Sequence, residues 1–177
     1  SSLSESFFIK GGDNYGFNTE ANFYLRKLKS NLKLKFNANR GFSFNAINGS
    51  DLRKNIYESL RYNVEWRTNF KTAFNFHLGT EWTESKVQSP GFENSNLNGF
   101  SFLDLFYKLN DRLDVKAVTE HYYFGNLEKN QRDYFFLDIE ATYKLKGDKY
   151  TIGLKANNVF NTEKFTTFNA TDVGYST

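Results

Sequence analysis

The stretch NLKLKFNANRGFSFNA, from Asn31 to Ala46, alternates between apolar and polar side chains almost without interruption. The polar phase carries Lys, Asn and Ser, and the apolar phase carries Leu32, Leu34, Phe36, Ala38, Phe42 and Phe44. Only Arg40 interrupts the apolar phase, and the neighbouring Gly41 predicts a bulge or the edge of a membrane at this point. A period of two residues is typical of a strand with one apolar and one polar face.

The same alternation recurs along the chain. It is clear in KTAFNFHLGTEW (71–82), RDYFFLDIEATYKL (132–145) and KYTIGLKA (149–156). In FSFLDLFYKL (100–109) both phases carry aromatic residues. We place Leu103, Leu105 and Tyr107 on the apolar face because Asp104 then points to the polar one, although Phe102 and Phe106 fit this assignment poorly.

The connections between these stretches are of two kinds. Short polar turns are predicted at 29–31, 68–70, 110–111 and 146–148, and longer irregular loops at 47–54, 85–98, 125–131 and from 161 onward. The order is therefore strand, short turn, strand, long loop, repeated. It predicts an all-β fold of about eight antiparallel strands in an up-and-down meander, each long enough for the ~9–11 residues that cross a bilayer.

Composition separates three all-β architectures. Aromatic residues make up 19% of the chain, there is 1 Pro, and the mean hydropathy is negative. A soluble sandwich draws its core mainly from Leu, Ile and Val and has no need of short turns at one end and long loops at the other. A β-propeller needs four strands per repeat of about 40 residues, whereas two are predicted here. A transmembrane barrel with a lipid-facing and a lumen-facing side agrees with all these features.

Several kinds of chemistry are not expected. The net charge of +3 comes from interspersed charges and predicts no nucleic-acid surface, and the absence of Cys excludes thiol chemistry. His77 and His121 are far apart in sequence, so we expect no metal site and no cofactor. The polar phase carries carboxylates that we expect to solvate a lumen and pair with Lys or Arg, namely Glu81, Glu120, Asp138 and Glu140. The chain is therefore not expected to be an enzyme.

Aromatic residues are predicted to gather at two levels. Trp66, Tyr107 and Tyr150 lie beside the short turns, and Trp82 lies toward the long loops. Such belts are typical of the two interfaces of a membrane. Tyr122, Tyr123, Phe124 and Tyr134 also lie toward the long loops, and they are candidate contacts for an extracellular ligand or partner.

One strand ends in a distinctive way. The stretch LKANNVFN closes with Asn157, Asn158, Val159, Phe160 and Asn161. It resembles the penultimate barrel strand of TonB-dependent receptors, in particular the Bacteroidetes outer-membrane β-barrel family. Segments 119–130 and 162–177 are similar to this family as well, so the resemblance runs from about Tyr15 to the end.

The resemblance implies a barrel of roughly 22 strands around an N-terminal plug. Residues 1–177 would be one segment of that barrel, near its C-terminal end and without the last strand. Within it we expect 1–16 to be a loop or the end of an earlier strand, 17–160 to be the strands, and 161–177 to be the last extracellular loop. The lack of Met also predicts a processed protein or a fragment.

The implied function is uptake of a nutrient or other ligand across the bacterial outer membrane. The implied partners are outer-membrane lipid, TonB acting on a plug that this segment does not hold, and a surface lipoprotein or other assembly subunits. Two alternatives remain open at this point. The chain would then be a structural, partner-binding barrel subunit of an outer-membrane assembly, or a complete small barrel of eight strands.

Overall fold

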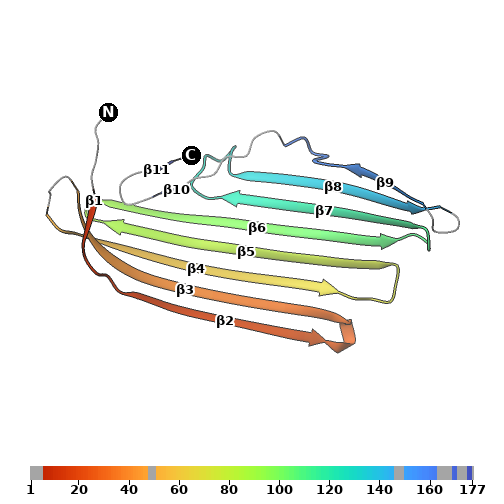
Figure 1. The fold of residues 1–177 in the computed structure, drawn as a ribbon, viewed down its shortest axis with the longest axis horizontal. Coiled ribbons are helices and arrows are strands. Elements are labelled where there is room, and N and C mark those ends of the chain that lie inside the picture. Colours follow the sequence, from red (N-terminus) through yellow and green to blue (C-terminus); the bar gives the residue numbers. More distant parts are fainter. Residues whose placement is uncertain (1–5, 48–50, 146–149, 163–168, 171–174, 177) are drawn as a thin grey trace.

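The computed structural model describes residues 6–47, 51–145, 150–162, 169–170 and 175–176. They form one large antiparallel sheet and a separate two-residue strand pair (Figure 1). The strands are β1 (Ser6–Lys10), β2 (Asn14–Leu25), β3 (Ser30–Ile47), β4 (Arg53–Thr68), β5 (Phe74–Ser89), β6 (Phe92–Lys108), β7 (Leu113–Phe124), β8 (Asp133–Lys144), β9 (Thr151–Ala156), β10 (Asn169–Ala170) and β11 (Tyr175–Ser176).

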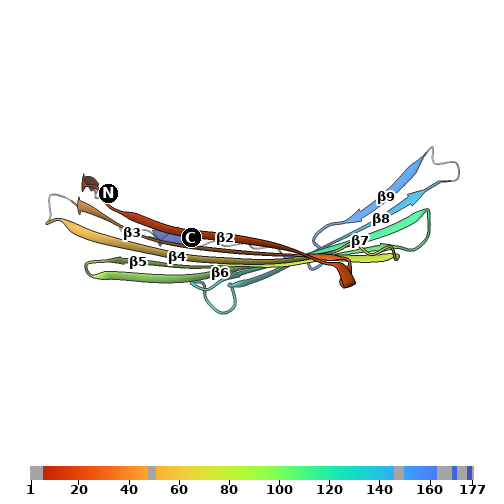
Figure 2. The ribbon, with the colours of Figure 1, turned by 90° about the horizontal axis from the view of Figure 1, so that it is seen from below.

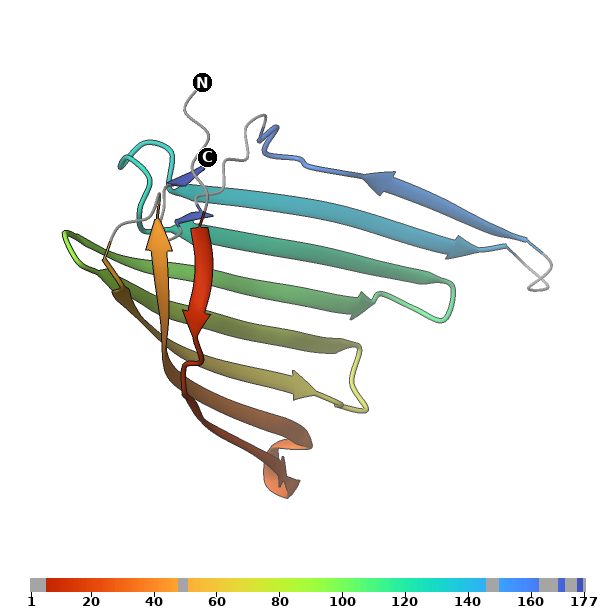
Figure 3. The same ribbon diagram turned by 60° about the vertical axis from the view of Figure 1, so that its left-hand side comes forward.

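Strands β3 to β9 pair in the order in which they occur in the chain, so the predicted up-and-down meander is confirmed. β1 and β2 follow each other along the same edge of β3, because β1 pairs with its last residues and β2 with Ser30 to Gly41. They act as one interrupted strand, which gives eight in all. The sheet is not closed: β2 and β9 form its two outer edges (Figure 3). The described strands therefore do not form a complete small barrel.

Pairing across the sheet assigns every side chain to a face, because directly opposed residues in an antiparallel ladder point to the same side. Leu34 lies opposite Val64, and Val64 lies opposite Thr80. We call this side the apolar face; its large apolar members include Phe17, Phe23, Leu32, Leu34, Phe36, Leu60, Tyr62, Val64, Trp66, Phe74, Phe76, Leu78, Trp82, Leu103, Leu105, Tyr107, Val115, Phe135, Leu137, Ile139, Ile152 and Leu154. The predicted phases are confirmed wherever the structure describes a strand.

The opposite side, which we call the polar face, carries most of the charged and amide side chains. Its members include Lys33, Lys35, Asn37, Arg61, Asn63, Glu65, His77, Glu81, Asp104, Glu120, Asp138 and Glu140. Short cross-strand ion pairs tie neighbouring strands together on this side, such as Lys35 Nζ to Glu20 at 3.4 Å.

The apolar face is not apolar over its whole height. Along β5 it runs from Phe74 to Trp82, which is about 27 Å at the usual rise of a strand, and then continues with Glu84 and Lys86. On β3 and β4 the same limit is marked by Arg40, whose Nε lies 3.0 Å from a carboxylate oxygen of Glu58. The register between β3 and β4 runs through Gly41 without a shift, so the bulge predicted there is not found. Arg40 marks the level at which the continuous apolar band ends, and the apolar pair Phe42 and Ile56 lies above it on the same face.

This sheet has almost no core. Among the described side chains, only two apolar ones are buried, Ala46 and Tyr134. Large apolar residues of the band remain exposed, for example Phe17 at 59% and Leu154 at 71% on the two edge strands. Figure 2 shows the sheet nearly edge-on as one thin, twisted layer with no second layer of described elements packed on it. A sheet that leaves this much apolar surface open is consistent with part of a larger barrel.

The part of the chain that the structure describes holds no helix long and apolar enough to cross a membrane. One short helical turn, the 3₁₀ helix η1 (Arg26–Leu28), connects β2 to β3. Lys29 caps its C-terminal end, with a φ of 41° and an N–H that donates to the Arg26 carbonyl.

Three glycines of the sheet, Gly41, Gly79 and Gly99, are each covered by an aromatic ring on the neighbouring strand, which for Gly41 is the ring of Tyr57. Gly79 lies opposite Phe102, and a Cβ on Gly79 would stand 2.6 Å from that ring. Gly99 and Trp82 make the same pairing on the apolar face. Aromatic side chains that fold over cross-strand glycines shield the backbone and fix the register. This explains Phe102, which fitted poorly in the sequence pattern: it occupies the space that Gly79 leaves on the polar face.

We expect Gly79→Ala to lower the free energy of unfolding by about 1 kcal/mol, because the added methyl forces the Phe102 ring out of its place. Gly153→Ala is the matched control, since no atom lies within 4 Å of the position its Cβ would take. That change should be neutral or slightly stabilising. Denaturant titration of both variants checks the prediction, and equal stabilities would contradict it.

One predicted loop is wrong. Residues 85–98 belong to a continuous hairpin, in which β5 runs to Ser89 and β6 starts at Phe92. Pro90 and Gly91 form the corner, with Gly91 at a φ of 78°, as a type II turn requires at this position. Lys86 Nζ lies 2.8 Å from Glu93 across the hairpin, and this hydrogen bond lowers the pKa of the Glu93 carboxyl. The segment looked irregular because both of its phases are polar.

Candidate functional site

The four aromatic residues predicted to meet a ligand do not lie together. Tyr122 and Tyr134 are direct partners on the polar face, and Phe124 packs on the Tyr134 ring at a centroid distance of 6.1 Å. Tyr123 points to the apolar face, where it lies opposite Gly99 and contacts the Trp82 ring at 5.5 Å. The structure therefore separates Tyr123 from the other three.

A polar-face aromatic cluster runs across β6, β7 and β8. We define it as Phe100, Phe102, Tyr122 and Phe136. The Phe100 ring lies 5.8 Å from Phe102 and 4.9 Å from Tyr122, and Tyr122 lies 6.0 Å from Phe136, edge to face. Of these four, only Tyr122 was predicted from the sequence as a candidate contact. The available signal was that the stretches around them carry aromatic residues on both phases.

Polar groups border this cluster on two sides. The Tyr122 hydroxyl donates to the Glu120 carboxylate at 3.0 Å. On the other side the His77 ring meets Phe102 edge to face at 4.7 Å, and its two nitrogens each lie 3.8 Å from a carboxylate oxygen, one of Glu65 and one of Asp104. Ring surfaces bordered by hydrogen-bonding groups can hold a ligand that has both planar or apolar parts and polar substituents.

The other histidine lies in a different setting. His121 is on the apolar face near its upper limit, stacked on Phe135 at 4.2 Å, and its Nε2 lies 3.0 Å from Asp133. Within the described residues, no group of three or more histidine or acidic side chains is arranged to hold a metal ion. The carboxylates of Glu81, Glu120, Asp138 and Glu140 lie on the polar face, as predicted.

The interface aromatics lie on the apolar face at two levels. Trp66 packs edge to face on Phe76 at 5.2 Å, near the turn between β4 and β5. Trp82 lies at the top of the band, and its indole N–H donates to the Thr80 hydroxyl at 2.9 Å. Tyr107 is opposite Phe74 at the short-turn end, and Tyr150 immediately precedes β9 with 69% of its surface exposed.

The motif Asn157 to Asn161 forms a compact loop at the end of β9. Asn158 and Asn161 have φ angles of 49° and 53°, in the left-handed region that Asn tolerates better than most residues. The Asn158 side chain accepts a hydrogen bond from the Thr162 N–H at 3.0 Å and donates to the Thr162 carbonyl at 3.2 Å. Its own N–H donates to the Asp138 carboxylate at 2.8 Å. These contacts give the motif a structural role: it ends the strand and holds the following segment on β8.

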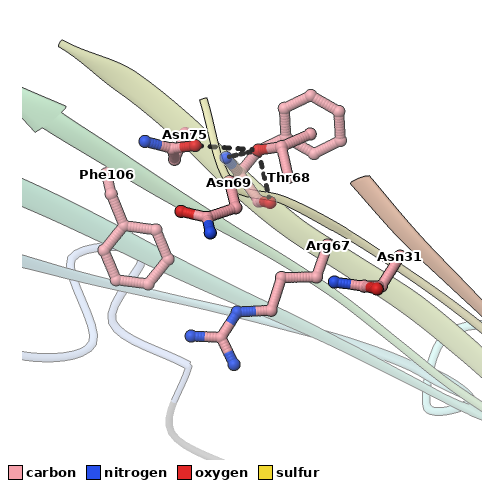
Figure 4. Close-up of a pocket in the computed structure, with 7 residues that line it drawn as sticks. Asn31, Arg67, Thr68, Asn69, Asn75 and Phe106 are labelled. Atoms are coloured by element: carbon pink, nitrogen blue, oxygen red, sulfur yellow. Dashed lines mark hydrogen bonds between the residues drawn. The ribbon is translucent and has the colours of Figure 1, made fainter. Parts of the chain in front are cut away.

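A hollow of about 450 Å³ opens at the short-turn end of the sheet. Figure 4 shows Asn31, Arg67, Asn69 and Phe106 around it, with Thr68 hydrogen-bonded within the same group. The polar atoms here also shape the turn: Thr68 Oγ1 donates to the Phe76 carbonyl at 3.0 Å and accepts from the Phe76 N–H at 2.8 Å. We therefore treat this hollow as part of the turn and not as a binding site.

Comparisons with known proteins add no relative to this description. No family model matches the chain, and no curated protein and no solved structure is significantly similar to it. The sheet itself is therefore the basis for any functional argument, and no family is identified for this chain.

Proposed function

We propose that this chain forms part of the wall of an outer-membrane β-barrel, and that the barrel is a TonB-dependent receptor that takes up a nutrient or other ligand. The observation that carries the proposal is the apolar band. It crosses the whole sheet on one face, while the opposite face is lined with charged and amide side chains. Lipid on one side and a wet lumen on the other would account for both surfaces.

The height and the borders of the band support the same assignment. Along β5 the band covers the residues from Phe74 to Trp82, which agrees with the ~9–11 residues that a tilted barrel strand needs to cross a bilayer. Trp66 and Trp82 lie near its two borders, as aromatic belts do. Beyond the upper border the face becomes charged at Arg40, Glu58 and Lys86. The open edges at β2 and β9 leave backbone groups that further barrel strands would pair.

The receptor part of the proposal rests on the resemblance of the Asn157–Asn161 motif to TonB-dependent receptors. The polar-face aromatic cluster supports it, because its rings would line the lumen through which a ligand passes. In this reading the plug and the TonB contact lie in other parts of the protein, and no catalytic role is assigned to the chain.

The orientation of the sheet across the outer membrane provides a test of the proposed function. The short turns would face the periplasm and the hairpin tip at Pro90 and Gly91 would face outward, because outer-membrane barrels have short periplasmic turns. We expect an epitope tag inserted between Pro90 and Gly91 to bind antibody on intact cells. The same tag between Lys71 and Thr72 should bind only after the outer membrane is permeabilised. Equal labelling of both tags on intact cells, or labelling of neither after permeabilisation, would contradict the proposal.

A further inference from the structure

A second hollow, of about 270 Å³, lies on the apolar face just above the band. Its lining comes from β2, β3 and β4, and consists of Tyr15, Arg40, Gly41, Phe42, Lys54 and Ile56. Apart from Gly41, whose backbone borders the hollow, these residues all belong to the apolar face. Two cations and three apolar or aromatic side chains therefore share one concave site on the surface that we assign to lipid.

The side chains of Arg40 and Lys54 both line this hollow, although one further residue pair of the same face lies between their positions in the ladder. Arg40 pairs with Glu58 in the ladder, and Lys54 pairs with Phe44, two rows higher. The Lys54 side chain bends back, so that its Nζ stands 4.4 Å from the centre of the Phe42 ring. Phe42 lies between the two rows, directly opposite Ile56. The result is an apolar floor with a positive charge at each end.

The charges around the hollow are unequal. Arg40 Nε lies 3.0 Å from Glu58, so one carboxylate offsets part of the positive charge. The Arg40 side chain nevertheless keeps 68% of its surface exposed, and guanidinium groups can hold a carboxylate and a second anion at the same time. The ammonium of Lys54 adds a second charge, which leaves the immediate surroundings with a net charge of about +1.

We propose that this hollow binds the phosphate-bearing headgroup of a lipid in the outer leaflet. The inference rests on the proposed function, because it requires the apolar face to meet lipid. Arg40 and Lys54 would contact phosphate oxygens, and Phe42, Ile56 and Tyr15 would contact the apolar or sugar part of the headgroup. The level agrees with this occupant, because the hollow begins where the apolar band ends and headgroups begin.

The charge pattern favours a lipid phosphate over other occupants. An uncharged acyl chain would gain nothing from the cations that border the floor. A free phosphate ion would gain nothing from Phe42 and Ile56. An occupant with both a phosphate and an adjoining apolar or ring surface uses the whole lining.

The test uses the protein at its natural length, purified in a zwitterionic detergent. Diphosphorylated lipid A is titrated in, and bound lipid is followed by native mass spectrometry. We expect the double variant Arg40→Gln/Lys54→Gln to weaken binding about tenfold, through loss of two charge-assisted contacts. Glu58→Gln should strengthen binding, since it removes the competing carboxylate. The control is Lys33→Gln/Lys35→Gln, which removes the same charge from the polar face and should leave binding unchanged.

Three results would overturn the inference: an unchanged affinity in the Arg40/Lys54 variant, an equal loss in the Lys33/Lys35 control, or equal binding of lipid A without phosphates. Inorganic phosphate is added as a competitor at equal concentration; displacement of the lipid by phosphate alone would reassign the site to the free ion. Failure here is distinguishable from failure of the proposed function. If the tag positions behave as expected and lipid binding does not change, only the headgroup site is wrong.

Discussion

Val64→Lys should lower the free energy of unfolding in a membrane by about 2–4 kcal/mol, the cost of a lysine near the middle of the lipid-facing surface of a barrel. Val64 lies well inside the apolar band, opposite Leu34 on one side and Thr80 on the other. It is 36% exposed in the sheet, so a lysine at this position would project into the surroundings of the apolar face. Guanidinium titration in lipid vesicles measures the change.

The control for this prediction is Asn63→Lys on the same strand. Asn63 points to the polar face, where Lys35 and Glu81 stand directly opposite it, so an added ammonium finds a carboxylate across one strand pair. We expect a change of less than about 0.5 kcal/mol, as for most surface substitutions. If Val64→Lys changed the free energy of unfolding as little as Asn63→Lys, the apolar face would be in contact with water. Both the barrel assignment and the headgroup site would then be wrong.

The faces of the sheet could be predicted from the sequence because alternation reports the surroundings of a strand directly. A one-residue slip would move Leu32, Leu34 and Phe36 to the other face, so the apolar phase also constrains the register. The same argument shows why residues 85–98 were missed. Beyond Trp82 both phases of β5 are polar, so the pairing with β6 continues without any alternation in the sequence.

The candidate site was harder to predict, because it depends on which strands stand side by side. Tyr122 and Tyr123 are adjacent residues of the same type, yet Tyr122 contacts Phe100 on the polar face and Tyr123 contacts Trp82 on the apolar face. Alternation along β7 predicts that the two side chains point to opposite faces. Which rings they contact depends on the register between β6 and β7, which the sequence does not show. Phe102 shows the same limit: only the position of Gly79 on the neighbouring strand explains an aromatic ring in a polar phase.

Asn158→Ala should destabilise the sheet by about 2–3 kcal/mol. The substitution removes both side-chain hydrogen bonds to Thr162, at roughly 1 kcal/mol each, and places a residue that disfavours the left-handed region at a φ of 49°. The backbone bond from this N–H to Asp138 does not depend on the side chain and remains. Denaturant titration gives the total, and hydrogen exchange at the Val159 N–H, which donates to the Leu137 carbonyl at 2.8 Å, reports whether the loop has opened.

Two further substitutions separate the causes. Asn158→Gly removes the hydrogen bonds but suits the left-handed region, so about 1 kcal/mol of the loss should be recovered. Asn158→Asp keeps an oxygen for the Thr162 N–H, but it turns the second carboxylate oxygen toward the Thr162 carbonyl and adds a negative charge near Asp138, so it should also be less stable than the native protein. If all three variants were as stable as the native protein, the closing hydrogen bonds would contribute nothing. The motif would then need an explanation outside this loop, such as contact with a neighbouring strand or a ligand.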